Sequence, residues 1–347
     1  MAHTPKPSTD ALLASARVVA LPLRVRFRGV LEREAMLFEG PNGWTEWSPF
    51  VEYEDEEAAQ WLAASIEYGW GQIPEPIRAH VGVNATLPAV AADQVATVLG
   101  RFGRFDTVKI KVAEAGQSLA DDIKRVLATK AFAPEAAIRL DANGGFEVEA
   151  AIELAEALQR QGIQLDYFEQ PVMTIAELAE ARIRLNRIGV RVAADESVRK
   201  VSDPLAVAQA GAADLLILKA QPLGGITRAI DIAREAGLPW VVSSALETSI
   251  GMSMGVHLAA LNPNEADAGL GTLSLFAGDV CEHPLVPQDA QLAVGRVTPS
   301  ESRLDIFKAE DHRSDWWIER LRQIPLLDRL SLFATNVWLP AVASRNR

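Results

Sequence analysis

The sequence predicts an α/β protein, a modified (β/α)₈ barrel of the TIM type that carries a smaller α+β capping domain formed by the N-terminal region and the C-terminal tail. From about residue 80 onward, short apolar segments alternate with segments of helical periodicity, a pattern typical of parallel βαβ units. The chain has 347 residues, 49% of them hydrophobic, which is enough for a barrel and a modest additional domain. Composition and pattern therefore agree on the fold class.

The first part of the chain differs from the rest, and residues 1–80 are expected to form the capping domain. Val19–Arg28 and Arg33–Glu39 have the composition of two strands. Gly43 predicts a turn, and Glu54–Tyr68 has the spacing of an amphipathic helix. Strands followed by a helix indicate a small α+β unit.

The repeat occupies residues 81–290, which are expected to form the barrel. Between the apolar segments lie helical ones; one of them ends at Gly237 with Pro239 just beyond, a helix stop signal. The eight expected strands are Val83–Leu87, Thr107–Val112, Ala137–Asp141, Leu165–Glu169, Arg191–Asp195, Leu215–Lys219, Pro239–Ser244 and Asp267–Thr272.

A doubly wound open sheet is the rival architecture. Such sheets usually begin with a Gly-rich turn, and the sequence contains neither G-x-G-x-x-G nor a Walker motif. Residues 291–347 show no clear repeat. Their apolar stretch Trp316–Trp338 is expected to pack back onto the barrel or the capping domain.

Charge and composition exclude several function classes. The net charge of -12, without a basic cluster, disfavours nucleic acid as a partner. The single cysteine, Cys281, excludes an intrachain disulfide and a thiolate metal cluster. No apolar run of about 18 residues predicts a membrane span, and no signal peptide is evident before Arg17, so a cytoplasmic location is expected. The oligomeric state is left open.

Acidic residues close three successive barrel strands, at Asp141, Glu169 and Asp195. The carboxyl ends of barrel strands meet at one rim, where barrel active sites lie. Three carboxylates held together repel one another, and oxygen-only ligands of this kind fit one Mg²⁺. Zn²⁺ is disfavoured because none of the five histidines closes a strand of this ring. The alternative is that each acid caps the following helix.

Lysines flank these acids on both sides. Lys109 and Lys111 share one face of their strand, whereas Lys219 closes a strand four places along the barrel and is expected on the other side of a substrate. Mutual repulsion and a nearby metal are expected to lower an amine pKa towards the value that a general base needs. A lysine base, a cation and a second ammonium can remove a proton next to a carboxylate and stabilise the enediolate. Structural ion pairs are the alternative.

The segments that carry these residues are V-K-I-K-V, R-L-D-A-N-G, Y-F-E-Q-P-V, A-A-D-E-S and L-K-A-Q-P-L-G-G-I, in that order. As a set they resemble the enolase superfamily, and its muconate-lactonizing subgroup in particular, over most of the chain. The resemblance implies that Lys111 is the acid/base and Lys219 its partner. It also implies that Asp141, Glu169 and Asp195 bind the metal.

Three further residues receive roles from the same resemblance. Lys109 and Glu196 would tune Lys111 and orient the metal ligands. Asn143 would help them or serve only as a turn residue. The mandelate-racemase subgroup carries a histidine in the region of Lys219, so this lysine argues against that subgroup.

Other segments bear on the substrate, namely Arg26–Val30, Arg33–Ala35, Gly43–Phe50 and Ser243–Gly251. They resemble the actinobacterial dehydratases of this subgroup that form 2-succinylbenzoate in menaquinone synthesis. The implied reaction is syn-dehydration of a small-molecule carboxylate, 2-succinyl-6-hydroxy-2,4-cyclohexadiene-1-carboxylate, through an enediolate. Ser243, Ser249 and Gly251 are expected to offer hydroxyls and amides to the succinyl carboxylate at a helix N-terminus, and Arg28 is a further candidate. Plain helix capping is the alternative.

Two departures from the subgroup affect this interpretation. Relatives often have G-x-G-E where this chain has Gly43-Trp44-Thr45-Glu46, a loop that helps to select the substrate. Relatives that racemise N-succinylamino acids tend to carry arginine where this chain has Pro222, which lowers the case for a racemase. An N-succinylamino-acid racemase, dipeptide epimerase or cycloisomerase on the same ring stays open, as does a catalytically silent barrel that binds ligands.

Overall fold

The structure is a computed structural model that describes residues 6–27, 29–200 and 203–324. Its capping domain is an antiparallel sheet in the order β1-β2-β3, with α2 against β2 and β3. In the capping domain the elements are α1 (Thr9–Ser15), β1 (Arg17–Phe27), β2 (Val30–Gly40), β3 (Gly43–Trp47) and α2 (Asp55–Trp70). The two predicted strands are thus present and longer than expected. Gly43 turns the chain with a φ of 107° and also begins the unpredicted strand β3.

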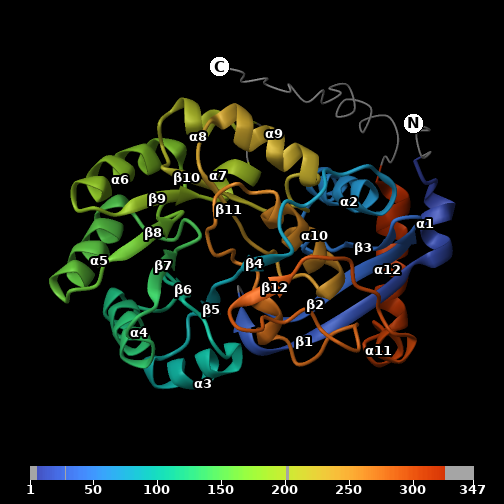
Figure 1. The fold of residues 1–347 in the computed structure, drawn as a ribbon, viewed down its shortest axis with the longest axis horizontal. Helices are drawn as coiled ribbons and strands as arrows, with labels where there is room; N and C mark the ends of the chain where they lie inside the picture. The colour runs from blue at the N-terminus through green and yellow to red at the C-terminus, as the bar shows by residue number, and fades with distance from the viewer. Residues whose placement is uncertain (1–5, 28, 201–202, 325–347) are drawn as a thin grey trace, which may run out of the picture.

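The barrel is a curled parallel sheet in the order β11-β10-β9-β8-β7-β6-β5 (Figure 1). Its strands are β5 (Ala85–Leu87), β6 (Thr107–Lys111), β7 (Ala137–Asp141), β8 (Leu165–Glu169), β9 (Arg191–Ala194), β10 (Leu215–Leu218) and β11 (Trp240–Val242). The helices that follow them are α3 (Val95–Leu99), α4 (Leu119–Phe132), α5 (Val148–Arg160), α6 (Ile175–Arg187), α7 (Glu196–Arg199), α8 (Ala206–Gln209), α9 (Ile226–Ala236) and α10 (Ser249–Ala260). Short 3₁₀ turns are η1 (Ala92–Gln94), η2 (Gly100–Phe102) and η3 (Thr272–Leu275).

The outer helices cover the sheet with apolar faces, as their periodicity predicts. On α5, Ala151, Ala155 and Leu158 are buried against the strands. Helix α9 ends at Gly237, whose φ of 65° is the left-handed conformation that a glycine cap favours. Local sequence and packing therefore agree in this part of the fold.

The expected eighth strand is not a regular strand in the structure. Only Ala268 and Gly269 of that segment pair with the barrel, through isolated parallel bridges to Val83 and Ser243. A side chain at Gly269 would lie 2.7 Å from the Ser243 hydroxyl oxygen, so the backbone approaches too closely for most residues. The prediction of Asp267–Thr272 as a full strand was therefore wrong, although this segment does join the two edges of the sheet.

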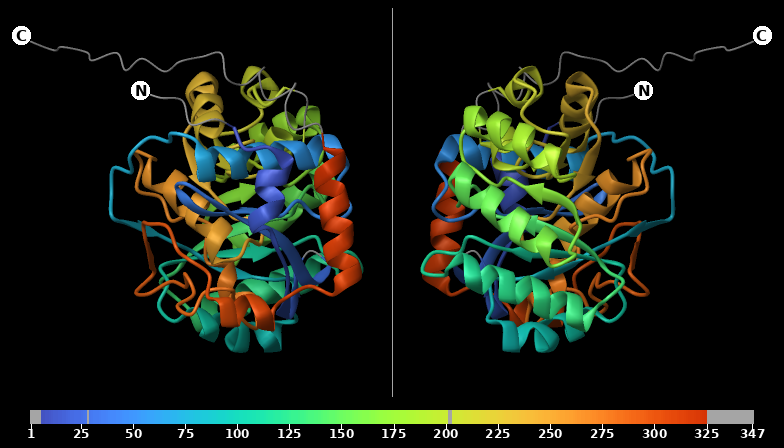
Figure 2. Two further views of the ribbon diagram at one scale, coloured as in Figure 1. Left: turned by 90° about the vertical axis from the view of Figure 1, so that its right-hand side faces the viewer. Right: turned by 90° about the vertical axis from the view of Figure 1, so that its left-hand side faces the viewer.

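The C-terminal part of the described chain packs on the capping domain. It contains β12 (Gln291–Ala293), which pairs with β4 (His80–Gly82), and then α11 (Glu301–Ile306) and α12 (Asp311–Gln323). Trp317 of α12 meets Trp47 edge to face, with ring centroids 5.2 Å apart. Figure 2 shows α12 alongside the capping elements. The remainder of the predicted apolar tail, up to Trp338, lies outside the described residues.

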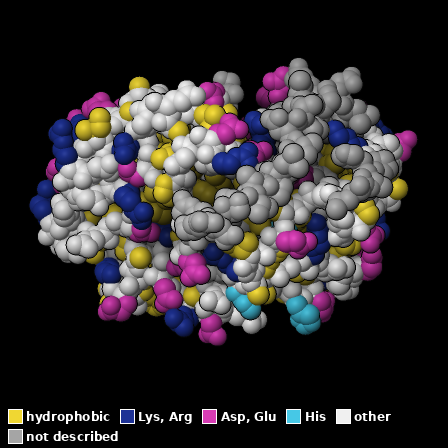
Figure 3. Space-filling model, turned by 45° about the horizontal axis from the view of Figure 1, so that its top comes forward, with side chains coloured by type: hydrophobic (Ala, Val, Ile, Leu, Met, Phe, Trp, Pro, Cys, Tyr) yellow, Lys and Arg dark blue, Asp and Glu magenta, His cyan; other side chains and the backbone are white. Residues whose placement is uncertain are grey.

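The described surface and helices bear on possible surroundings of the molecule. On the face drawn in Figure 3, lysine and arginine side chains are interspersed with aspartate and glutamate. None of the helices in the described ranges combines the length and apolar character needed to cross a lipid bilayer.

Candidate active site

The predicted ring of lysines and carboxylates comes together at the carboxyl end of the barrel. Lys111, Asp141 and Glu169 are the last residues of β6, β7 and β8, and their Cα atoms are paired in register across the three strands. Asp195 and Lys219 directly follow β9 and β10. All five residues are buried. Parallel pairing thus brings distant parts of the sequence to one rim.

The helix-capping alternative does not account for these acids. Helix α5 begins after Glu147, six residues beyond Asp141, and α6 is capped by the Thr174 side chain rather than by Glu169. Asp195 does occupy the N-cap position of α7, but its side chain makes no capping hydrogen bond. The three carboxylates are directed to other partners.

Those partners are the basic side chains of the ring. Lys111 Nζ donates to Asp141 Oδ2 at 2.5 Å, and Lys219 Nζ donates to Asp195 Oδ2 at 2.5 Å. Lys109 Nζ lies 2.9 Å from Glu169 Oε2 and 3.5 Å from Asp141 Oδ2. The ring therefore forms two ion-paired groups, one around Lys109 and Lys111 and one around Lys219.

Burial and neighbouring charges shift the pKa values of these groups in different directions. Burial opposes ionisation of Asp141, but the ammonium groups of Lys111 and Lys109 outweigh it and lower the pKa of the carboxyl. Burial and the negative charge of Asp141 raise the pKa of the Glu169 carboxyl to about 8. Glu169 is thus the carboxylate of this group that most needs further positive charge.

The pKa of Lys109 is governed by the carboxylates of the ring. The expectation that repulsion and a nearby metal ion lower the pKa of an amine of the pair stays a prediction. Burial does oppose the Lys109 ammonium, yet Glu169 and Asp141 outweigh it and raise its pKa. Lys109 is therefore held as a cation, which fits the supporting role that the resemblance implied better than the role of a base.

Asn143, Glu196 and Arg199 form a second layer behind the ring. Asn143 Oδ1 accepts a hydrogen bond from Lys111 Nζ at 2.6 Å, and Asn143 Nδ2 donates to Glu196 Oε1 at 3.2 Å. Asn143 also has the left-handed φ of 48° that suits a turn residue, and its supporting role stays a prediction. Arg199 donates to Asp195 at 2.9 Å and to Glu196 at 2.5 Å.

Sequence analysis missed Arg199, although the pattern D-E-S-V-R contained a signal for it. Acid and arginine four residues apart lie on one face of a helix, and α7 begins immediately after Asp195. Arg199 is buried, so its two ion pairs are shielded from water.

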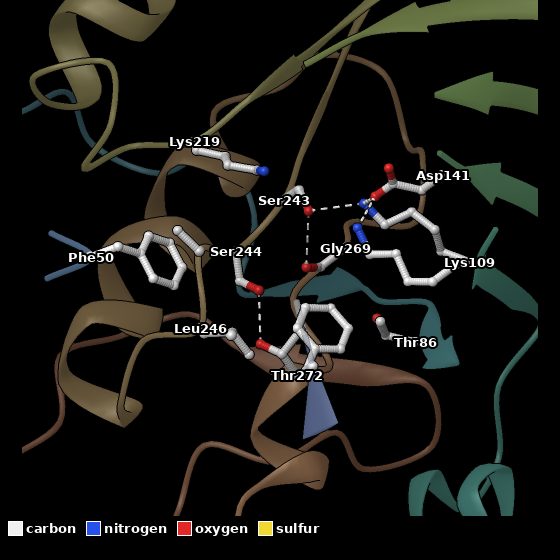
Figure 4. A pocket seen from close by; sticks show the side chains of 13 residues that line it. Phe50, Thr86, Lys109, Asp141, Lys219, Ser243, Ser244, Leu246, Gly269 and Thr272 are labelled. Carbon is white, nitrogen blue, oxygen red and sulfur yellow. Dashed lines mark hydrogen bonds and ion pairs between the residues drawn. The ribbon is translucent and has the colours of Figure 1, made fainter. Parts of the chain in front are cut away.

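A narrow cavity of about 20 Å³ lies between the two ion-paired groups. Figure 4 shows Lys219 on one side of it and Lys109 with Asp141 on the other. That volume holds about one water molecule, so a larger ligand must displace side chains of the wall. The lining comprises Phe27, Phe50, Thr86, Lys109, Lys111, Asp141, Lys219, Ser243, Ser244, Ala245, Leu246, Gly269 and Thr272.

The predicted substrate-binding residues separate into three groups. Ser243 lines the cavity, and its hydroxyl accepts a hydrogen bond from Lys109 Nζ at 3.2 Å. Ser249 and Gly251 are buried in α10, away from the cavity lining. Arg28 lies outside the described residues.

The N-terminus of α10 already holds carboxylates from the protein itself. The Gly251 amide donates to Glu46 Oε2 at 3.1 Å, and the Ser249 amide donates to Asp279 Oδ1 at 3.0 Å. Thr248, the N-cap residue, accepts from the Ile250 amide. The capping interpretation thus holds for this helix, and Glu46 of β3 is a residue whose role the sequence did not reveal.

The donor set of the ring suits a hard divalent cation. Asp141, Glu169 and Asp195 provide buried carboxylate oxygens at the ends of three consecutive strands, and the negative charges of Asp141 and Asp195 raise the pKa of Glu169. As the side chains stand, no three acidic, histidine or cysteine groups in the described ranges enclose a metal position. The ammonium and guanidinium groups of Lys109, Lys111, Lys219 and Arg199 neutralise the carboxylates instead.

Comparison with known proteins identifies relatives over most of the chain. A protein named o-succinylbenzoate synthase from Mycobacterium tuberculosis is 50% identical over 317 residues, covering 91% of this chain and 95% of its own. The protein of the same name from Mycobacterium marinum is 48% identical over 330 residues, covering 94% and 99%.

Solved structures share the fold. Muconate lactonizing enzyme from Pseudomonas fluorescens, complexed with muconolactone, has a TM-score of 0.72 at 19% identity and covers 85% of this chain and 98% of its own. The L-Ala-D/L-Glu epimerase from Bacillus subtilis has a TM-score of 0.70 at 22% identity, with coverage of 82% and 96%. The family model described as Enolase C-terminal domain-like matches residues 89–302, and the model described as Enolase N-terminal domain-like matches residues 18–69. The chain therefore belongs to the enolase superfamily, as its motifs predicted.

Proposed function

We propose that the chain catalyses the o-succinylbenzoate synthase reaction, dehydration of 2-succinyl-6-hydroxy-2,4-cyclohexadiene-1-carboxylate to 2-succinylbenzoate, in menaquinone synthesis. The observation that carries this proposal is a complete lysine–carboxylate ring in a chain that is about half identical to relatives of that name. Such a ring can remove a proton next to a carboxylate and stabilise the resulting negative charge. The reaction is a syn elimination of water.

We assign the acid/base role to Lys111. In its neutral form the amine takes the proton α to the carboxylate, and the substrate becomes an enediolate. The ammonium thus formed then gives a proton to the departing hydroxyl group, which leaves as water. The Asn143 carbonyl oxygen, 2.6 Å from Lys111 Nζ, supports the assignment because it can hold the amine in one orientation.

We assign Lys219 to the opposite side of the substrate. Lys219 lies across the cavity from Lys109 and Asp141 (Figure 4). A buried ammonium in that position stabilises the enediolate as its charge develops, and it can lie over the face of the forming aromatic ring. Its hydrogen bond to Asp195 holds the Lys219 side chain at the cavity rim.

A divalent metal ion is the cofactor type of this superfamily. We propose Mg²⁺ for this chain, held by Asp141, Glu169 and Asp195. When bound, the ion supplies a Lewis acid for the substrate carboxylate. Lys109 donates to Glu169, and Glu196 shares Arg199 with Asp195, so both residues would orient the ligands.

We also propose a division of the chain into residues 1–80 as the capping domain, 81–290 as the barrel, and 291–347 as a C-terminal segment that packs on the capping domain or the barrel. The packing of α12 on the capping sheet and the pairing of β12 with β4 support this division. The active-site cavity accordingly has walls from cap and barrel, because Phe27 and Phe50 belong to the cap.

The test is a direct comparison of two activities with purified protein and Mg²⁺. Dehydration of the cyclohexadiene carboxylate is followed by the absorbance of the aromatic product, beside racemisation of N-succinyl amino acids followed by polarimetry. We expect efficient dehydration and slower racemisation, because Pro222 replaces the arginine of the racemases. Efficient racemisation without dehydration would overturn the proposal, as would the absence of both.

A further inference from the structure

Arg33 of β2 is a buried arginine that joins the cap to the wall of the active-site cavity. Its side chain is 2% exposed. Nε donates to the carbonyl oxygen of Leu246 in the barrel at 3.1 Å, and Nη2 donates to the carbonyl oxygen of Ser48 in the cap. The guanidinium also lies over the Phe50 ring, 4.2 Å from its centroid.

Two of the three residues that Arg33 contacts in this way line the cavity. Phe50 and Leu246 are part of its lining, and Figure 4 shows them together on the side away from Lys109 and Asp141. The planar guanidinium of an arginine can donate to several carbonyls in fixed directions while its face stacks on an aromatic ring. Arg33 thus connects the two residues of this wall through one side chain.

The backbone of Leu246 requires such support. Its φ of 63° is left-handed, a conformation that costs free energy in a residue with a branched side chain. Arg33 binds the Leu246 carbonyl, the Glu247 carboxylate accepts the Ala245 amide at 2.7 Å, and the Ser244 amide donates to the Gly269 carbonyl at 3.0 Å. Without the hydrogen bond from Arg33, the segment 244–247 can relax and move the Leu246 side chain.

The charge of Arg33 is balanced across the same interface. Burial disfavours the guanidinium charge, whereas the negative charges of Glu46 and Glu247 favour it. Its hydrogen bonds, however, go to the carbonyls of Leu246, Glu34 and Ser48. The hydrogen bonds of Arg33 therefore hold the backbone around the cavity rather than the two carboxylates.

We propose that Arg33 is a positioning residue that sets the Phe50–Leu246 wall of the cavity and thereby governs substrate binding. The proposal rests on the proposed dehydratase function, because binding is measured with the substrate of that reaction. Arg33 contacts none of the ring residues in the described structure, so its effect on the chemical step is expected to be small.

Three variants test the proposal in the full-length protein with Mg²⁺. Arg33→Met removes the fork and keeps much of the volume, and Arg33→Lys keeps the charge beside Glu46 and Glu247. Arg313→Met is the matched control, because Arg313 also belongs to the cap assembly but binds Glu34 at 2.8 Å and contacts neither wall residue. Steady-state dehydration kinetics give KM and kcat, and amide hydrogen exchange reports on residues 244–248.

We expect KM to rise about tenfold or more in Arg33→Met with kcat within about threefold of wild type, since a charged hydrogen bond to the wall is lost. Exchange of the 244–248 amides should accelerate in the same variant, and Arg33→Lys should fall between it and the wild type. In Arg313→Met both KM and exchange should be unchanged.

Unchanged KM and unchanged exchange in either folded Arg33 variant would overturn the proposal, and so would an equal change in the Arg313→Met control. If Arg33→Met does not fold, the lysine variant decides, because it retains the buried charge. If the wild type does not dehydrate the substrate, the proposed function fails, whereas the exchange comparison still tests the role of Arg33.

Discussion

Replacing Lys111 by alanine should abolish turnover while the protein stays folded. The substitution removes the amine that we assign as base, and with it the 2.5 Å hydrogen bond to Asp141 and the 2.6 Å hydrogen bond to Asn143. Lys109 is the nearest amine that could substitute. It is bound to both oxygens of Glu169, and Glu169 and Asp141 raise its pKa, which makes it a poor acceptor for the α proton.

The expected size of the kinetic effect follows from what a general base contributes. Positioned acid–base groups typically accelerate a step by about 10²–10⁴-fold, or roughly 3–5 kcal/mol of activation free energy. Lys111 acts twice in the proposed reaction, once as base and once as acid. A fall in kcat of about 10³-fold or more is therefore expected.

The stability cost should be much smaller than this because Asp141 is not left alone. Its carboxylate still accepts the Asn143 amide at 3.1 Å and stays 3.5 Å from Lys109 Nζ. Loss of one partner then costs about 1–3 kcal/mol of unfolding free energy, rather than the roughly 3–5 kcal/mol of an orphaned buried charge. The melting temperature should fall by only several degrees.

The assay combines dehydration kinetics with exchange of the substrate α proton in D₂O, and circular dichroism establishes folding. Lys308→Ala is the control, an exposed lysine 2.9 Å from Asp311 whose loss should change neither rate nor fold. Dehydration by folded Lys111→Ala within about tenfold of the wild-type rate would refute the assignment. Retained α-proton exchange would refute it as well.

Two further predictions concern the metal and the cap interface. Chelation by EDTA should remove dehydration, and Mg²⁺ should restore it. Mg²⁺ should also raise the melting temperature of the wild type and of the exposed control Glu149→Gln. It should raise the melting temperature of Asp195→Asn much less. Full activity in chelated protein, or an equal thermal shift in all three, would exclude the proposed site. Burial and the charge of Glu46 raise the pKa of Glu247 from 4.5 to about 7, so the folded protein binds this proton more tightly than the unfolded chain. The free energy of unfolding should therefore fall by on the order of 3 kcal/mol as the pH rises from about 4.5 to 7. Glu247→Gln should remove this part of the pH dependence. Parallel plots of unfolding free energy against pH for the two proteins, from about pH 5 to 8, would contradict the prediction.

The elements predicted most accurately are those whose local sequence reflects burial on both sides. Ala137–Asp141 and Leu165–Glu169 occur with the predicted bounds, because an apolar run closed by an acid marks both the buried strand and its rim. The eighth strand was overpredicted for the opposite reason. Its glycines allow a close backbone approach that shortens regular pairing, and composition does not reveal that approach.

Strand spacing was enough to place Lys111, Asp141, Glu169, Asp195 and Lys219 on one rim, since parallel βαβ repeats bring successive strand ends together wherever they lie in the chain. Contacts between cap and barrel follow no such repeat. Glu46 accepts a hydrogen bond from an amide of α10, and Arg33 donates to the Leu246 carbonyl. Both contacts join residues more than two hundred positions apart, and they depend on how the capping domain and the barrel pack together. Periodicity encodes which face of an element is buried, whereas the identity of the group that meets it emerges only when the chain has packed.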